Sequence, residues 1–72
     1  MQQAIQLLDV VTLVDDLPQS GLVRGQVGTV VARLAPDVFE VEFVDNDGRT
    51  YALLPLKRDQ ILLLHFEPLV AA

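Results

Sequence analysis

The segment Val38–Val44 has the sequence VFEVEFV, and it decides the fold class of this chain. Successive side chains of a β-strand point to opposite faces, so Phe39, Val41 and Phe43 would face a core and the two glutamates between them would face solvent. The next four residues, Asp45–Gly48 (DNDG), are typical of a tight hairpin turn. The segment therefore predicts a strand followed by an antiparallel return strand.

Further strands are predicted on both sides of this hairpin, where β-branched and alternating residues lie between turn residues. In chain order, the expected strands cover residues 9–16, 26–34, 38–44, 49–54 and 60–66. Pro55 and the following LKRD segment are expected to interrupt the sheet with a single helical turn before the last strand. The prediction is an all-β fold, a small five-stranded SH3-like barrel. A five-stranded oligonucleotide-binding barrel is the competing topology, but it normally needs a longer chain.

The predicted organisation is an N-terminal lead-in at residues 1–8, the barrel at 9–67 and a C-terminal tail at 68–72. Gly28 lies inside a predicted strand, where a glycine usually marks a bulge or the close approach of another segment. We expect the sheet to bend there. The residues expected to define turns or bends are Gly21, Gly25, Gly28, Asp47 and Gly48.

Several segments together resemble a family of small bacterial proteins, the domain of unknown function 4926. They are GLVRGQVGTVV at 21–31, VFEVEFVDNDGRTYALLPL at 38–56, the lead-in LLDVVTLVDDLP and the ending LKRDQILLLH. The resemblance covers about Leu7 to His65. This family is similar to the SH3-like barrels of the nitrile hydratase β subunit and of KOW modules. The resemblance implies the fold and assigns no activity, so no catalytic residue is carried over from it.

The composition argues against an enzyme. The 72 residues include no cysteine and one histidine, which excludes disulfides and makes a protein-only zinc site untenable. His65 is interpreted as structural, and the DNDG turn lacks the flanking oxygen ligands of a calcium loop. We expect no catalytic residue, no cofactor, no metal and no small-molecule ligand.

Charge and hydropathy limit the possible partners. Ten acids oppose five cations, for a net charge of −5, whereas nucleic-acid binding depends on Lys and Arg. This balance disfavours nucleic-acid binding. A KOW-like nucleic-acid-binding module is kept only as the alternative, and it would use a basic face of Arg24, Arg33, Arg49, Lys57 and Arg58. No apolar stretch approaches the roughly 20 residues of a membrane span, and no signal peptide is recognised. We expect a cytoplasmic protein.

The last predicted strand is the most unusual stretch because it is apolar on both faces. Whether Ile61 and Leu63 or Leu62 and Leu64 point inward, large apolar side chains are left outside, and such surface usually marks an interface. The expected interface residues are Leu62, Leu64, Phe66, Val10 and Val14. The alternative is that Ile5, Leu7 and Leu8 fold back over this surface. The sequence thus predicts a non-enzymatic protein-interaction module, a homo-oligomer or the partner of another protein. An accessory or antitoxin-like subunit of a larger complex is a further possibility.

Overall fold

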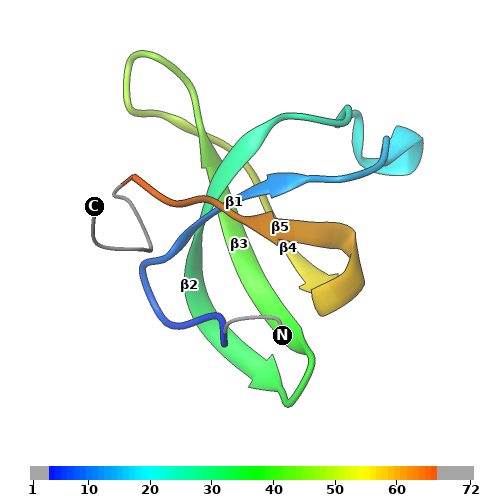
Figure 1. The fold of residues 1–72 in the computed structure, drawn as a ribbon. Helices are drawn as coiled ribbons and strands as arrows, with labels where there is room; N and C mark the ends of the chain where they lie inside the picture. The colour runs from blue at the N-terminus through cyan, green and yellow to red at the C-terminus, as the bar shows by residue number, and fades with distance from the viewer. Residues whose placement is uncertain (1–3, 67–72) are drawn as a thin grey trace.

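The computed structural model describes residues 4–66, and it contains five antiparallel strands in one sheet. The strands are β1 (Val10–Leu13), β2 (Val27–Ala35), β3 (Val38–Val44), β4 (Thr50–Lys57) and β5 (Ile61–Leu63). Their order across the sheet is β4-β3-β2-β1-β5, so the chain forms a β2–β3–β4 meander and then returns to place β5 beside β1 (Figure 1). The predicted all-β class with five strands is confirmed. The predicted tail at 68–72 lies outside the described residues.

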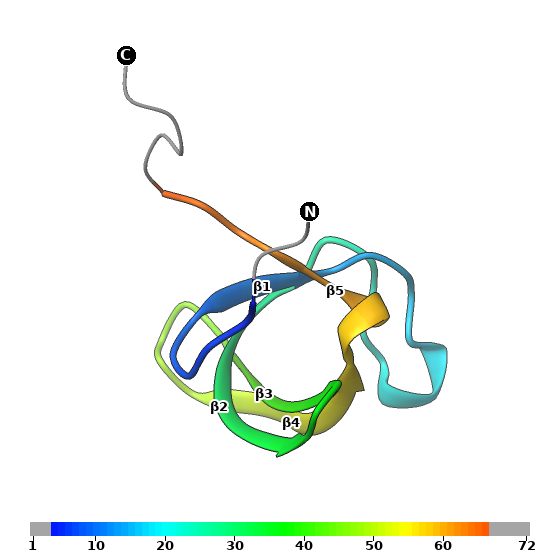
Figure 2. The same cartoon turned by 60° about the horizontal axis from the view of Figure 1, so that its bottom comes forward.

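The sheet curls around its own concave face, as Figure 2 shows, but it does not close. Strands β4 and β5 are its two edges, and within the described chain no ladder joins them. They are connected by a short 3-10 helix, η2 (Arg58–Gln60). The backbone N–H of Lys57 donates to Oε1 of Gln60 at 2.7 Å and fixes the start of this turn. The helical turn predicted before the last strand is therefore present.

The core occupies the concave face. Phe39, Val41 and Phe43 are buried, as the alternation predicts. Their neighbours in the core come from every other strand and from the segments before and between them: Ile5, Val11, Leu13, Leu22, Val30, Leu56 and Ile61. Among the described residues no polar or charged residue is buried. Burial of apolar surface, at about 25 cal/mol per Å², is thus the main source of stability.

Pro55 does not interrupt the sheet, and that prediction was wrong. Strand β4 continues through Pro55 to Lys57, with Pro55 opposite Glu40. The reason is the position of β4 at the sheet edge, where a residue without an N–H can be accommodated on the unpaired side. The first and last strands are shorter than predicted, because β1 ends after Leu13 and β5 can pair only with β1.

Two glycines have clear structural reasons. Gly48 has φ +79° in the hairpin turn, a conformation that L side chains rarely adopt. There the Asp45 carboxylate accepts bonds from the N–H groups of Asp47 and Arg49, at 2.9 and 3.0 Å. Gly28 is buried under β3, and a Cβ built on it would lie 2.6 Å from Cγ1 of Val41. Of the two features that a glycine inside a strand usually marks, the structure confirms the close approach at Gly28, whereas the irregularities in the β2–β3 pairing lie between Val30 and Ala32 and between Arg33 and Ala35. The predicted turn glycines Gly21 and Gly25 also have positive φ, at 70° and 92°.

The described part of the lead-in, residues 4–8, does not cover the outside of the curled sheet. Ile5 packs into the core and is 8% exposed, whereas Leu7 and Leu8 remain 62% and 75% exposed. The N–H of Leu8 donates to the Val30 carbonyl oxygen at 2.7 Å, which extends the pairing along β2. The expected alternative, in which these three side chains fold over the outer surface of the last strand, is not what the structure shows.

Candidate functional site: the outer patch

The candidate site lies on the convex face of β5, β1 and β2. In one row across the three strands, Leu62 on β5 is opposite Thr12 on β1, and Thr12 is opposite Val27 on β2. In the next row the N–H of Leu64 donates to the Val10 carbonyl oxygen at 3.0 Å. All five side chains alternate with core residues and therefore point outward. We call these residues the outer patch: Val10, Thr12, Val27, Leu62 and Leu64.

The outer patch is uncharged and largely apolar. Leu62 and Val27 are 54% and 48% exposed, and the other three residues are half-buried. The Thr12 hydroxyl donates to the Gln26 carbonyl oxygen at 3.1 Å, so its hydrogen-bonding need is met within the chain. The patch thus offers a partner apolar contact without an unsatisfied donor, and its burial would be favourable.

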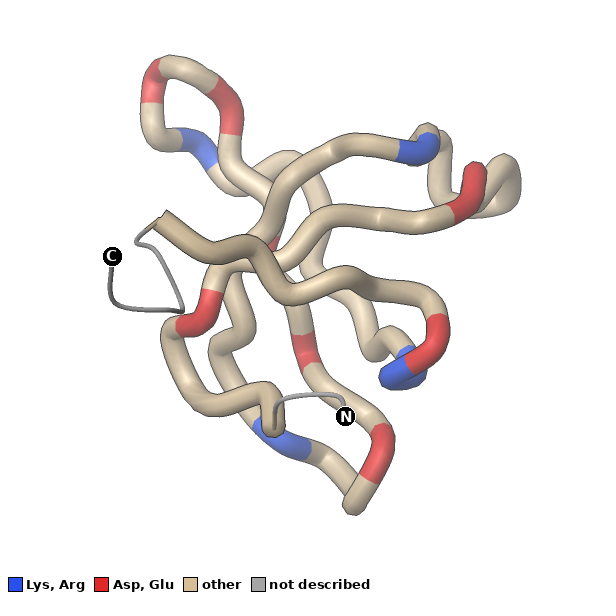
Figure 3. The backbone as a smooth tube through the Cα atoms, viewed as in Figure 1, with Lys and Arg blue, Asp and Glu red and all other residues tan. Residues whose placement is uncertain are grey.

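The charged residues lie around the outer patch rather than in it. Figure 3 shows β1 and β5 without a charged residue, while the acids gather at loops and strand ends and on β3. On β3, Glu42 is opposite Thr29, which is in turn opposite Val10 of the patch. Its carboxylate accepts a bond from the Thr50 hydroxyl at 2.6 Å. Asp9, just before β1, accepts the N–H of Gln6 at 2.8 Å. A contact centred on the patch therefore need not bury a carboxylate, which would carry a large desolvation cost.

The structure shows which face of the last strand is inside. Ile61 is 3% exposed and Leu63 is half-buried, both facing the core beside β1. Leu62 and Leu64 face outward next to Val10, so three of the predicted interface residues lie together.

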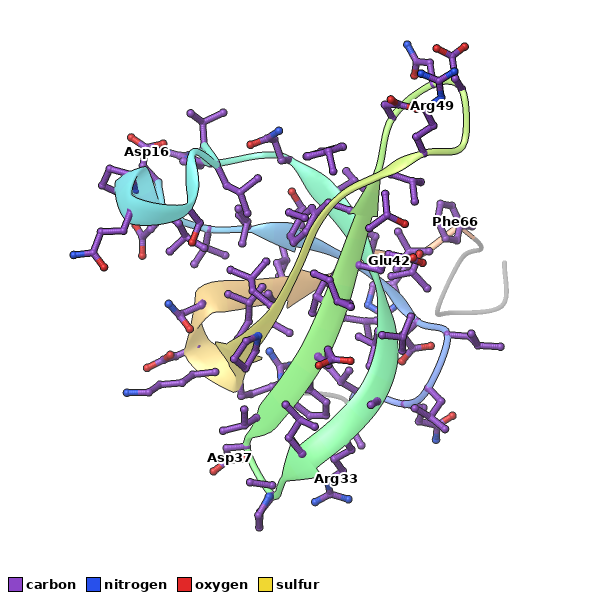
Figure 4. All side chains as sticks on the ribbon, turned by 180° about the vertical axis from the view of Figure 1, so that it is seen from behind. Asp16, Arg33, Asp37, Glu42, Arg49 and Phe66 are labelled. Atoms are coloured by element: carbon purple, nitrogen blue, oxygen red, sulfur yellow. The ribbon has the colours of Figure 1, made fainter. Side chains whose placement is uncertain are left out.

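The other two predicted interface residues, Val14 and Phe66, are more peripheral. Val14 is half-buried just after β1, where its N–H donates to the Gln60 carbonyl oxygen at 3.1 Å. Phe66, labelled in Figure 4, is 77% exposed at the end of the described chain, beyond β5. Val27 was missed by the sequence analysis. Its alternation with the buried Gly28 could have placed it outside, but its register against β1 could not be known.

Each sheet edge carries a feature that hinders the addition of another strand. On β5, the N–H of Ile61 donates to the Arg58 carbonyl oxygen, and the carbonyl oxygen of Ile61 accepts Nη1 of Arg58 at 3.2 Å. On β4, Pro55 supplies no N–H. Such features are common ways of preventing edge-to-edge pairing. These features favour the face of the sheet over its edges as a contact surface.

The five cations do not form one basic face. Arg33, Lys57 and Arg58 lie near one end of the curled sheet, next to Asp37 and Asp59. Arg24 lies in the loop before β2 and Arg49 in the hairpin turn before β4 (Figure 3). The arrangement therefore offers no continuous track of positive charge for a phosphate backbone.

Within residues 4–66, no group of three or more His, Asp or Glu side chains could hold a metal ion. His65 is exposed. No helix in this part of the chain is long and apolar enough to cross a membrane.

Comparison with known proteins identifies the family. Neither the curated proteins nor the solved structures contain a match to this chain. The family profile described as "Domain of unknown function (DUF4926)" matches residues 7–63, which span β1 to β5 and the whole outer patch except Leu64. The chain therefore belongs to the DUF4926 family.

Proposed function

We propose that this protein is a non-enzymatic interaction module that self-associates through the outer patch. The observation that carries the proposal is the exposed, uncharged surface on β5, β1 and β2, with Leu62 and Val27 about half exposed on either side of Thr12. Small domains of this length bury little apolar surface on their own, and they often bury more by associating. A second copy offers an equally uncharged surface.

The charge distribution supports a second copy as the occupant. The chain carries a net charge of −5, so two copies repel each other at long range. A contact centred on the outer patch keeps the acidic loops at its rim, where water and salt screen them. The protected edges favour packing of two sheets face to face, at about 10 Å separation, over strand addition. The proposal is therefore a two-fold symmetric sheet-on-sheet dimer.

The test compares two leucines with the same exposure. Leu62 in the outer patch and Leu53 on β4 are both 54% exposed. Sedimentation velocity is measured from low to high micromolar concentration for the wild type, Leu62→Glu and Leu53→Glu. We expect a concentration-dependent dimer for the wild type and Leu53→Glu, and a monomer for Leu62→Glu. A wild type that stays monomeric throughout refutes the proposal, and so does equal dissociation by both variants.

The proposal also covers the fold relationship, the source, the location and two alternative functions. The SH3-like relationship is supported by five strands with a 3-10 turn before the last one. A bacterial source and a cytoplasmic location rest on the family resemblance and on the absence of cysteine. Association with a different protein, as an accessory or antitoxin-like subunit, predicts that the isolated protein is a monomer. Leu62→Glu would then leave its oligomeric state unchanged. A KOW-like function predicts a salt-dependent mobility shift of RNA, which the divided cations disfavour.

A further inference from the structure

The bend of the chain just before β1 contains a leucine where the backbone geometry favours glycine or asparagine. Leu8 has φ +71°, and it is the one residue other than glycine with a positive φ within residues 4–66. In this left-handed conformation the Cβ of most residues crowds the following carbonyl oxygen, whereas glycine and asparagine tolerate it. Leu8 therefore carries a conformational cost, and an outlier of this kind points to a function at that position.

Hydrogen bonds hold the strained conformation in place. The N–H of Asp9 donates to the Gln6 carbonyl oxygen at 3.1 Å, and the N–H of Gln6 donates to Oδ2 of Asp9 at 2.8 Å. These bonds close a four-residue turn, QLLD at 6–9, in which Leu8 is the third residue, the position that has a positive φ in a type II turn. We call these four residues the leucine turn.

The leucine turn is also joined to β2. Val30 accepts the N–H of Leu8 at 2.7 Å and donates its own N–H to the Asp9 carbonyl oxygen at 2.9 Å. Two residues therefore oppose one, as in a β-bulge of the type whose left-handed position is usually glycine. Both the turn and the bulge thus favour a residue other than leucine at position 8.

The two leucines of the turn are not used in packing within the chain. Leu7 and Leu8 are 62% and 75% exposed, and neither belongs to the core or to the partly buried residues packed against it. An exposed leucine in a strained conformation contributes little to folding. Its apolar surface becomes favourable when another surface covers it.

The leucine turn continues one end of the outer patch. Leu8 precedes Val10 by two residues, which places their Cα atoms at most about 7 Å apart. Because β5 runs antiparallel to β1 and Leu64 bonds to Val10, the residues after Leu64 leave the sheet at this same end. Phe66 follows there and is 77% exposed. Figure 1 shows the turn as the blue bend that leads into β1.

We propose that the leucine turn is part of the self-association contact, with Leu7 and Leu8 of each copy packed against the second copy. This inference rests on the proposed function and extends the contact beyond the outer patch. Residues 4–8 carry no charge, and the Asp9 carboxylate already accepts the N–H of Gln6. A second copy, whose outer patch is equally uncharged, can therefore cover the turn without burying an unpaired charge. Two-fold symmetry uses the turn twice.

The test makes the same change at three exposed leucines and measures the dimer Kd by sedimentation velocity, beside the wild type and Leu62→Glu. Leu7→Asn and Leu8→Asn should each raise Kd about tenfold, the scale of an apolar side chain that loses its burial. Leu53→Asn is the matched control on β4, where the leucine is 54% exposed, and it should leave Kd unchanged.

A second measurement separates the contact from folding. In the Leu62→Glu background, which is monomeric under the proposed function, Leu8→Asn should raise Tm by about 4–8 °C because asparagine relieves the strain. Leu7 has no positive φ, so Leu7→Asn should leave Tm nearly unchanged. A variant that folds more stably and yet dimerises more weakly cannot owe its weaker dimer to a damaged fold.

The possible failures are distinguishable. A dimer that Leu62→Glu dissociates but that Leu7→Asn and Leu8→Asn leave intact overturns this inference while the proposed function stands. Equal weakening by Leu53→Asn, or a lower Tm for Leu8→Asn in the monomeric background, also overturns it. A wild type that stays monomeric at every concentration refutes the proposed function and this inference together.

Discussion

Substitution of Gly28 by alanine should destabilise the fold, although it adds only one methyl group. The new Cβ would lie 2.6 Å from Cγ1 of Val41, 2.9 Å from the carbonyl oxygen of Glu42 and 3.1 Å from Cδ2 of Phe43. Contacts shorter than 3.0 Å force a shift, and here one partner is backbone. Val41 and Phe43 are both 0% exposed, so neither has space to move into.

The size of the effect follows from two opposing contributions. Overpacking of a dense core costs about 1–3 kcal/mol. Replacement of glycine by alanine also restricts the unfolded chain, which returns about 0.4–1 kcal/mol. The net loss for Gly28→Ala is therefore about 1.5 kcal/mol. In a domain of this size each kcal/mol lowers Tm by about 4–8 °C, so we expect a decrease of about 6–12 °C.

The assay is thermal and urea unfolding followed by circular dichroism at a fixed low protein concentration. A double-mutant cycle with Val41→Ala isolates the steric cause, because that variant removes the Cγ1 atom nearest to the new Cβ. Gly28→Ala should cost at least 1 kcal/mol less in the Val41→Ala background than in the wild type. A Tm for Gly28→Ala at or above that of the wild type, or the same cost in both backgrounds, would refute this reasoning.

Three further perturbations probe other parts of the fold. Ile5→Ala should lower the free energy of unfolding by about 2 kcal/mol and shift the urea midpoint, because Ile5 is 8% exposed in the core; an unchanged midpoint would contradict that packing. Asp45→Ala removes the acceptor of two turn amides and should cost about 1 kcal/mol in thermal unfolding, whereas no loss would mean that the turn does not need the carboxylate. Arg58→Met removes the donor to the Ile61 carbonyl oxygen and should speed aggregation on heating, measured by light scattering. Lys57→Met is the control. Equal aggregation rates for the two variants would count against protection of the β5 edge.

Local patterns predicted the parts of this fold that depend on local physics. The alternation at Phe39, Val41 and Phe43 was sufficient because a period of two reports directly that one face is buried. The DNDG segment predicted its turn because Gly48 must adopt a positive φ and Asp45 can bond its own backbone. Gly28 predicted a close approach, and the structure shows Val41 as the nearest neighbour.

The remaining features depend on strand order and register, which one sequence does not encode locally. Pro55 is compatible with a strand only because β4 is at the edge of the sheet. Val27 joins the outer patch because it is opposite Thr12, a relation between distant segments. Arg33 and Arg58 line one pocket because η2 is fastened to the β2–β3 turn, and this contact between distant segments is not encoded locally in the sequence.

The pairing of β5 with β1 also determines where the molecule opens first. These strands have three and four residues, whereas β2, β3 and β4 have nine, seven and eight and are joined by short local turns. Amides of the β1–β5 ladder should therefore exchange with solvent through the lowest-energy local opening, while the meander remains protected. The outer patch straddles this ladder. A second copy bound there would hold the two ends of the fold together, so the melting temperature should rise with protein concentration.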